Sequence, residues 1–366
     1  MNGLYAGLMS GTSLDGVDGV LVDLSAPFRL LAHVHRPFPA ALRDELLSLN
    51  RPGGLDELHR SALAANGVAT AYAGVVQALL AEAKLDASAV SAVGAHGQTV
   101  RHQPDGRGYT VQLLNAAQLA EDCGIDVVAD LRSRDVAAGG QGAPLVPAFH
   151  AAIFARPGVD SAVLNLGGIA NLSLLSSDGA VRGFDTGPGN ALLDHWALQH
   201  LGRAYDEAGA WAAQGRVHDG LLQALCAEPY FSAQPPKSTG RDLFEPGWLN
   251  TRLARFPGLA PVDVQATLLE LTVRTVKDAL LTCAPGTATL RVCGGGARNT
   301  LMMQRLTQAL PGVDVRDTGA EGVAPEHVEA LAFAWLAKAF VERRPANLPA
   351  VTGAAGPRLL GALYPA

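Results

Sequence analysis

The sequence predicts an α/β fold made of two related domains, and three observations support this. Its 366 residues exceed what one ordinary hydrophobic core holds and suit two domains of about 150–200 residues each. Apolar strand patterns alternate with helical patterns along the chain. A strand–turn–strand unit with a glycine-rich polar turn opens each half, near residue 10 and near residue 168. We therefore expect domains at 1–145 and 146–366, with the C-terminal tail packing back on the first domain.

Strand and helix patterns follow one another in both halves. In the first half we expect strands over 4–9, 17–24, 89–95 and 127–129, a helix over 55–80, and a loop over 130–142. In the second half we expect strands over 162–164, 172–175, 181–184 and 290–293, and helices over 191–200, 267–281, 299–309 and 325–340. Sequence identity between the halves is too weak for a repeat, so their kinship is predicted from architecture alone.

The bulk composition argues against several classes of protein. The formal net charge is -6 without a long basic run, which argues against a nucleic-acid partner. No apolar run approaches about 18 residues and the N-terminus lacks a basic region, so we expect neither a membrane span nor a signal peptide. The four cysteines are widely spaced, which favours reduced thiols of a cytoplasmic protein over disulfides or a zinc site.

The first turn, Ser10 to Asp18, has the composition of a phosphate-binding segment. Its glycines and hydroxyls can present N–H and O–H donors to phosphate oxygens. Asp15 and Asp18 are candidate ligands of Mg²⁺, which prefers oxygen ligands. The same residue types also make ordinary hairpin turns, and the sequence of a P-loop is absent.

The second turn, Asn165 to Asn171, has the same character. Two such turns, one in each half, can converge on a polyphosphate in a cleft between domains. Gly294 to Gly296 lie between a strand and a helix, where glycines let the backbone approach a nucleotide. These three glycines are equally compatible with a tight loop that serves packing alone.

Three further side chains are candidates for chemistry. Asp185 follows a predicted strand, where it is either a general base or the cap of the next helix or turn. His96 also follows a strand and is either a hydrogen-bonding partner of a substrate or a structural histidine. Glu329 lies among apolar residues of the last helix, at a solvated edge or in a site.

Taken together, these segments resemble one family, the anhydro-N-acetylmuramic acid kinases of the acetate and sugar kinase/Hsp70/actin superfamily. The resemblance runs over essentially the whole chain. It is carried by the residues at 7–18, 95–99, 139–147, 165–171, 184–190, 237–241, 293–299, 329–335 and 351–354.

The resemblance implies two ribonuclease H-like (actin-like ATPase) domains, with ATP and Mg²⁺ in an active-site cleft between them. It implies Asp185 as catalytic base and Glu329 as a second active-site carboxylate. The implied ATP-binding residues are Gly11, Thr12, Ser13, Leu14, Asp15, Gly16, Val17, Asp18, Asn165, Gly167, Gly168, Asn171, Gly294, Gly295, Gly296 and Asn299. The implied sugar-binding residues are His96, Gln98, Asp130, Arg134, Asp135, Gln141 and Asn190.

The implied reaction is phosphorylation of 1,6-anhydro-N-acetylmuramic acid by ATP, with water opening the anhydro ring, in peptidoglycan recycling. A homodimer is common in such kinases. In many kinases of the superfamily an Asp precedes the Gly-Thr of the first turn, but here Met9 and Ser10 do, so the acid that organises Mg²⁺ stays open. Two alternatives also remain: a kinase acting on an ordinary hydroxyl, and a non-enzymatic ATP-binding switch, chaperone or sugar-sensing regulator.

Overall fold

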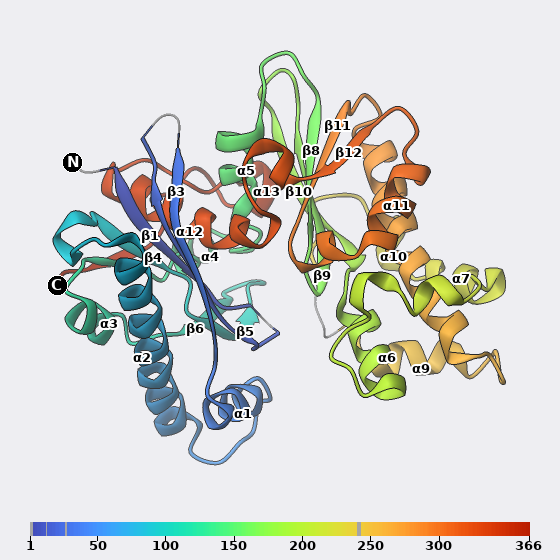
Figure 1. The fold of residues 1–366 in the computed structure, drawn as a ribbon, viewed down its shortest axis with the longest axis horizontal. Helices are drawn as coiled ribbons and strands as arrows, with labels where there is room; N and C mark the ends of the chain where they lie inside the picture. The colour runs from blue at the N-terminus through green and yellow to red at the C-terminus, as the bar shows by residue number, and fades with distance from the viewer. Residues whose placement is uncertain (1–2, 12, 26–27, 240–242) are drawn as a thin grey trace. The chain divides into compact units, whose positions relative to one another are not determined.

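A computed structural model describes residues 3–11, 13–25, 28–239 and 243–366 (Figure 1). The chain forms two compact units: unit 1 comprises Met1–Phe149 and His327–Ala366, and unit 2 comprises His150–Glu326. The sequence suggests one boundary, at 145/146, whereas the structure has one at 149/150 and a second at 326/327. The second boundary arises because the last long helix packs on the sheet of unit 1.

Unit 1 is built on a six-stranded sheet with the order β13-β7-β4-β1-β2-β3. Its central strand β1 is antiparallel to β2 and parallel to β4; β3 is antiparallel to β2, and β7 is parallel to β4. The C-terminal strand β13 closes the edge by pairing with β7. The strands are β1 (Leu4–Met9), β2 (Gly16–Asp23), β3 (Arg29–Pro37), β4 (Ala92–Ala95), β7 (Val127–Ala129) and β13 (Ala362–Tyr364).

Helices cover this sheet, and a hairpin follows β4. The elements are α1 (Ala40–Leu49), α2 (Glu57–Ala83), α3 (Ala116–Cys123), α4 (Ser133–Ala137), α12 (Val328–Val341), α13 (Pro349–Thr352), the 3₁₀ turn η1 (Ala87–Ala89) and the hairpin β5 (Gln98–Gln103)–β6 (Tyr109–Leu113). Helix α5 (Val146–Phe154) runs across the boundary into unit 2. Within the described residues, α2 is the one helix long and apolar enough to cross a membrane, and its buried face, with Val68, Tyr72 and Val76, belongs to the core of unit 1.

Two glycines bring α12 close to the sheet. A Cβ atom at Gly7 of β1 would meet the carbonyl oxygen of Ala330, and one at Gly94 of β4 would meet that of Phe333. Helix and sheet backbones therefore approach closely, as glycine allows. This packing fixes the first turn of α12, which carries Glu329.

Unit 2 repeats the topology of unit 1. Its sheet has the order β10-β9-β8-β11-β12, with β8 and β9 antiparallel, β9 and β10 antiparallel, and β8, β11 and β12 parallel. The strands are β8 (Ser161–Leu166), β9 (Ile169–Leu175), β10 (Val181–Pro188), β11 (Thr289–Cys293) and β12 (Asp314–Asp317). Five strands of each unit thus share one order and one set of directions, which confirms the predicted α/β class and the kinship of the two domains.

The helices of unit 2 pack around α10, whose Leu268, Leu271 and Val276 lie in a core with Leu164 and Val292 of the sheet. The helices are α6 (Ala191–Leu201), α7 (Asp219–Cys226), α8 (Pro229–Ser232), α9 (Pro246–Leu253), α10 (Pro261–Cys283) and α11 (Thr300–Ala309). Short 3₁₀ turns are η2 (Glu207–Gly209), η3 (Ala212–Gln214), η4 (Gly295–Arg298), η5 (Thr318–Glu321) and η6 (Pro325–His327).

The structure differs from the sequence prediction mainly where tertiary contacts decide. The strand expected over 181–184 extends to Pro188, with an irregularity in its pairing between Asp185 and Gly187. The helix expected from Pro325 begins as a 3₁₀ turn and becomes α-helical at Val328. The sequence prediction also omits β3, the β5–β6 hairpin, the short strands β12 and β13, and several short helices, among them α1, α3 and α5.

Candidate active site

The first turn connects β1 to β2 and uses its residues in different ways. The amide of Leu14 donates to the carbonyl oxygen of Gly11 at 3.3 Å, and Leu14 has a φ of 58° with a buried side chain. Ser13 Oγ donates to Asp15 Oδ1 at 2.8 Å, and both side chains are exposed. Thr12 lies outside the described residues.

Beyond the turn, Gly16 and Val17 begin β2. A Cβ atom at Gly16 would meet the carbonyl oxygen of Arg36 on β3, and the side chain of Val17 is fully buried. Together with Leu14, these residues can offer only their backbone to a ligand. Among the described residues of this turn, the exposed side chains of Ser13 and Asp15 can reach a ligand.

Asp18 is paired across the sheet with two histidines. Its Oδ1 lies 3.0 Å from His35 Nδ1 and 3.5 Å from His33 Nε2. Burial raises the pKa of Asp18, but the hydrogen bonds and charges of His33 and His35 outweigh it, so the pKa lies below its usual range. The carboxylate is therefore anionic, with partners from the protein itself.

His96 is buried at the end of β4 between the first turn and Arg132. Its Nδ1 donates to the carbonyl oxygen of Ser10 at 3.1 Å, and its Nε2 accepts from Nε and Nη2 of Arg132 at 3.1 and 2.9 Å. Burial, followed by the charge of Arg132, lowers the pKa of His96 well below its usual value. The ring is thus neutral, with the proton on Nδ1.

Arg132 is not singled out among the predicted site residues, although it lies in the predicted loop over 130–142. Besides contacting His96, its Nη1 donates to the carbonyl oxygen of Gly142 at 2.8 Å. Burial lowers its pKa to about 10, while the charges of Glu329 and Asp135 act in the opposite direction. Arg132 therefore links His96, the 139–142 loop and the carboxylate of Glu329, all within unit 1. Its place in the same polar loop as Asp130 and Arg134 was the one available signal.

Gln98 ties the β5–β6 hairpin to the first turn. Its Nε2 donates to the carbonyl oxygen of Gly11 at 3.1 Å, and its side chain is buried. Oε1 has no hydrogen-bond partner among the described residues. Gln98 and His96 thus both contact the backbone of the first turn, which brings two predicted sugar-site residues next to a predicted phosphate segment.

Asp135 is a fully buried hub. Its Oδ1 accepts from Asn347 Nδ2 at 2.7 Å and Thr352 Oγ1 at 2.8 Å, and its Oδ2 accepts from the amide of Gly142 at 2.8 Å. Both oxygens are occupied, so Asp135 joins the 139–142 loop to the C-terminal segment.

The other predicted residues of this loop lie nearer the surface. Asp130, with a φ of 53°, and Arg134 are exposed, and Gln141 Nε2 donates to Asp105 Oδ1 at 3.2 Å. The amide of Gln141 also donates to the carbonyl oxygen of Thr352 at 2.7 Å, so the backbone of Gln141 is tied to the buried network around Asp135.

In unit 2, Gly167 and Gly168 form the tight turn between β8 and β9. The amides of Asn190 and Gly189 donate to their carbonyl oxygens at 2.8 and 2.9 Å. Asn190 Nδ2 also donates to the carbonyl oxygen of Leu166 at 3.0 Å. Asn190 therefore anchors this turn to the start of α6.

The second glycine segment lies directly against this turn. Gly294 has a φ of 80°, and a Cβ atom there would meet backbone atoms of Leu166; one at Gly296 would meet the Leu166 side chain and the Asn190 amide. Gly295, by contrast, faces open space. Two predicted nucleotide segments, far apart in sequence, are thus neighbours.

Two asparagines complete this part of unit 2. Asn299 Oδ1 accepts from the amide of Met302 at 3.0 Å and so caps α11. Asn171 pairs in register with Asn165 on β8, and its Oδ1 is buried without a hydrogen-bond partner among the described residues. A structural role thus accounts for the Asn299 side chain, whereas Asn171 retains a free acceptor.

Asp185 lies at the irregularity of β10 and is held from three sides. The amide of Thr239 donates to its Oδ2 at 2.9 Å, Tyr230 Oη donates to its backbone oxygen at 2.8 Å, and its own amide donates to the carbonyl oxygen of Lys237 at 3.1 Å. Helix α6 begins at Ala191, so Asp185 does not cap it.

The surroundings of Asp185 change its proton affinity. Burial raises the pKa of Asp185 to about 7, against a smaller lowering by the Thr239 amide. A carboxylate that titrates near neutral pH suits a general base. Burial and the charge of Asp185 together also raise the pKa of Tyr230.

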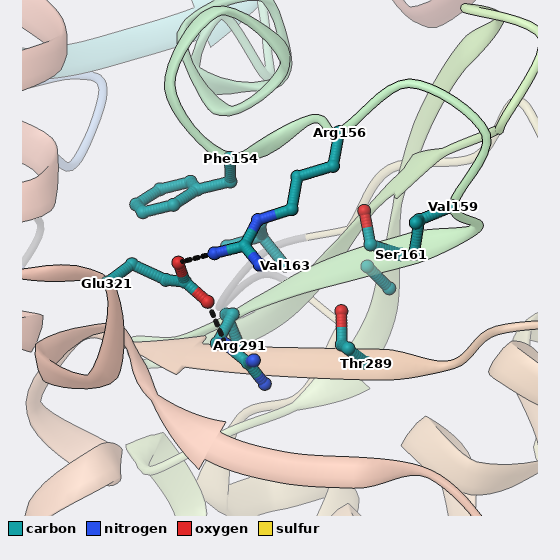
Figure 2. Close-up of a pocket in the computed structure, with 9 residues that line it drawn as sticks. Phe154, Arg156, Val159, Ser161, Val163, Thr289, Arg291 and Glu321 are labelled. Carbon is teal, nitrogen blue, oxygen red and sulfur yellow. Dashed lines mark hydrogen bonds and ion pairs between the residues drawn. The ribbon is translucent and has the colours of Figure 1, made fainter.

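A small pocket lies elsewhere in unit 2. Figure 2 shows Glu321 between Arg156 and Arg291, with Ser161 and Thr289 beside them. Ser161 and Thr289 begin the parallel strands β8 and β11, whereas the turn at Gly167 and the glycines from Gly294 follow their carboxyl ends. Open α/β sheets bind ligands at the carboxyl ends of strands. The pocket therefore lies at the opposite edge of the sheet from the glycine segments.

The family model and the curated relatives name the same family. The model of the family described as anhydro-N-acetylmuramic acid kinase matches residues 3–366. A protein of that name from Variovorax paradoxus is 58% identical, covering 99% of each chain, and one from Bordetella petrii is 60% identical, covering 99% of this chain and 96% of that one. Among solved structures, the activator of the 2-hydroxyisocaproyl-CoA dehydratase from Clostridium difficile is 13% identical with a TM-score of 0.48, covering 93% of this chain and 96% of that one.

Proposed function

Because the chain belongs to the anhydro-N-acetylmuramic acid kinase family, we propose that it is an ATP-dependent kinase acting on 1,6-anhydro-N-acetylmuramic acid. The product would be N-acetylmuramic acid 6-phosphate, a step of peptidoglycan recycling. The observation that carries this proposal is Asp185, a carboxylate fixed by a backbone amide and titrating near pH 7.

The substrate explains why a base is needed. In a 1,6-anhydro sugar, O6 is an ether oxygen and carries no proton, so a base has nothing to remove from the phosphate acceptor. In the proposed reaction Asp185 takes a proton from water, whose oxygen bonds to C1. The C1–O6 bond breaks with its electron pair on O6, and O6 attacks the γ-phosphorus as ADP leaves. The water proton ends on Asp185 and returns to solvent.

ATP would be held mainly by backbone groups. In unit 1 these belong to the turn from Gly11 to Asp18, where the side chains of Leu14 and Val17 are buried in the core. In unit 2 they belong to the turn at Gly167 and Gly168 and to the adjacent glycines 294–296. Amides exposed in such turns favour phosphate oxygens.

Mg²⁺ fits Asp15 better than Asp18. Asp15 is exposed and contacts one hydroxyl, whereas Asp18 would have to exchange its two histidine partners. Within the described residues no cluster of three His, Cys, Asp or Glu side chains could hold a metal ion alone, and Mg²⁺ in kinases usually binds one or two carboxylates, phosphates and water. The ion would neutralise phosphate charge during transfer.

The sugar would be recognised in unit 1 by His96, Gln98, Arg132 and Glu329. The unpartnered Oε1 of Gln98 offers an uncharged polar contact. Both nitrogens of His96 are already hydrogen-bonded, so His96 would act by holding Arg132, which offers a positive charge of the kind that binds a carboxylate such as the lactyl group. Asp135 and Asn190 would act indirectly, because their side chains hold the 139–142 loop and the Gly167 turn. Asp130, Arg134 and Gln141 remain candidates for direct contact.

Isotope labelling tests the reaction. The chain is incubated with ATP, the anhydro sugar and ¹⁸O-water, and the product is quenched before its reducing-end oxygen exchanges with solvent. Unlabelled product held in ¹⁸O-water for the same time is the control. We expect one label at C1 of a 6-phosphorylated sugar; phosphorylation without label would favour a kinase that acts on an ordinary hydroxyl.

We also propose a homodimer in the cytoplasm. The four free cysteines suit a reducing compartment, and light scattering of the purified chain at micromolar concentration measures its mass directly. A monomeric mass would contradict the dimer.

A further inference from the structure

The segment from Tyr230 to Thr239, which we call the strap, is hydrogen-bonded to Asp185 on strand β10. Lys237 Nζ donates to the carbonyl oxygens of Tyr230 and Phe231, each at 3.1 Å, and lies 4.8 Å from the centre of the Tyr230 ring. The strap is thereby closed on itself. It then holds Asp185 through the Tyr230 hydroxyl, the Lys237 carbonyl and the Thr239 amide.

Thr239 is the member of the strap that faces the carboxyl group. Its amide occupies Oδ2 of Asp185 at 2.9 Å, which leaves Oδ1 as the oxygen available to a proton. Its Oγ1 is buried and has no hydrogen-bond partner among the described residues. A buried hydroxyl without a partner costs about 1–3 kcal/mol, so such a group is expected to find one when a ligand binds.

We propose that Thr239 is a positioning residue whose hydroxyl orients the water that Asp185 deprotonates. This inference rests on the proposed function of Asp185. A water at this place donates one proton to Asp185 Oδ1 and the other to Thr239 Oγ1, which leaves an oxygen lone pair for C1. A threonine hydroxyl can accept in this way while its own proton points elsewhere. On attack the first proton passes to Asp185, and the second stays on the new C1 hydroxyl.

Three variants of the full chain test this role. Thr239→Val keeps the shape and the backbone amide but removes the hydroxyl; Thr239→Ser keeps the hydroxyl but removes a methyl group. Ser238→Ala changes the exposed neighbouring hydroxyl and serves as the matched control. Asp185→Asn reports separately on the base.

We expect Thr239→Val to lower kcat by about 10- to 100-fold with little change in KM for the anhydro sugar. Thr239→Ser should stay within about 3-fold of the parent and Ser238→Ala should equal it. Because the Thr239 amide still contacts Oδ2 in Thr239→Val, the acid limb of the pH–rate profile should keep its midpoint.

Several results would overturn the inference. If the Thr239 side chain served packing alone, the order of activities would be reversed, and Thr239→Val would be more active than Thr239→Ser. If Thr239→Val raised KM and left kcat unchanged, Thr239 would bind a sugar hydroxyl instead of the water. If the acid limb of the pH–rate profile moved, Thr239 would act by changing the pKa of Asp185. Full activity of Thr239→Val beside an inactive Asp185→Asn refutes the role of Thr239 alone, whereas an active Asp185→Asn refutes the base and the water site together.

Discussion

The raised pKa of Asp185 leads to a quantitative prediction about pH. As a general base Asp185 acts only when deprotonated, and its pKa of about 7 compares with an ordinary value of 3.8. We therefore expect kcat/KM to fall about tenfold for each pH unit below neutrality, with half of the limiting rate near pH 7. Asp185→Asn should remove turnover by a factor of about 10² or more.

The same pKa sets a cost in stability. A carboxyl whose pKa is raised by folding destabilises the folded state above its unfolded pKa, because the folded chain holds the charged form poorly. The cost grows as pH rises from 3.8 to about 7 and is constant above. At about 1.4 kcal/mol per pKa unit the upper bound is about 4 kcal/mol, less where solvent reaches the group.

Asp185→Asn should therefore be inactive and yet more stable than the parent chain at pH 8, with the difference shrinking towards pH 4. Urea unfolding at several pH values measures this, with the protein free of ligands. Two results would refute the claim that burial raises the pKa of Asp185. One is a pH profile of kcat/KM whose acid limb has its midpoint near pH 4, and the other is an Asp185→Asn variant that is less stable than the parent chain at pH 8.

The remaining predictions concern the loop hub, the nucleotide segment and the metal. Asp135→Ala removes three buried hydrogen bonds and leaves the Gly142 amide without its acceptor, while Asn347 and Thr352 keep only longer bonds to the carbonyl oxygens of Gly356 and Leu348. We therefore expect a loss of about 2 kcal/mol or more in the free energy of unfolding, measured by urea titration. Gly294→Ala should weaken ATP binding at least about tenfold by calorimetry, since its φ of 80° and the nearby backbone of Leu166 exclude a Cβ atom. Asp15→Asn should raise the Mg²⁺ concentration needed for half-maximal activity, whereas Asp18→Asn should not, and the opposite order would place the ion at Asp18.

The parts of the fold that the sequence predicted are those with strong local signals. Buried strands such as Val127–Ala129, and helix α6 with its glycine C-cap at Gly202, have apolar patterns that need no tertiary knowledge. Strand β3 is not predicted because it is an edge strand in which all side chains but that of Ala32 are exposed or partly exposed, so its sequence lacks a clear alternation of apolar and polar residues.

The residues of the candidate site likewise fall into those with a local sequence signal and those whose role depends on contacts distant in sequence. The glycine turns were identifiable because glycine at a strand end is itself a signal. The choice between base and cap for Asp185 was undecidable, since its burial depends on a segment about fifty residues away that carries Tyr230 and Thr239. Arg132 was passed over for the same reason: its importance comes from His96 and Gly142, which only the folded chain brings to it.

The close fit of α12 against Gly7 and Gly94 has a consequence for how the chain is made. Unit 1 is assembled from both ends of the sequence, with all of unit 2 inserted between its parts. During synthesis five of the six strands of this sheet emerge first, but α12, which covers β1 and β4, and the edge strand β13 leave the ribosome only after unit 2. Unit 2 can therefore fold while one face of the unit 1 sheet is still exposed to solvent. Packing of α12 on that face, which completes unit 1, is then the last step of folding.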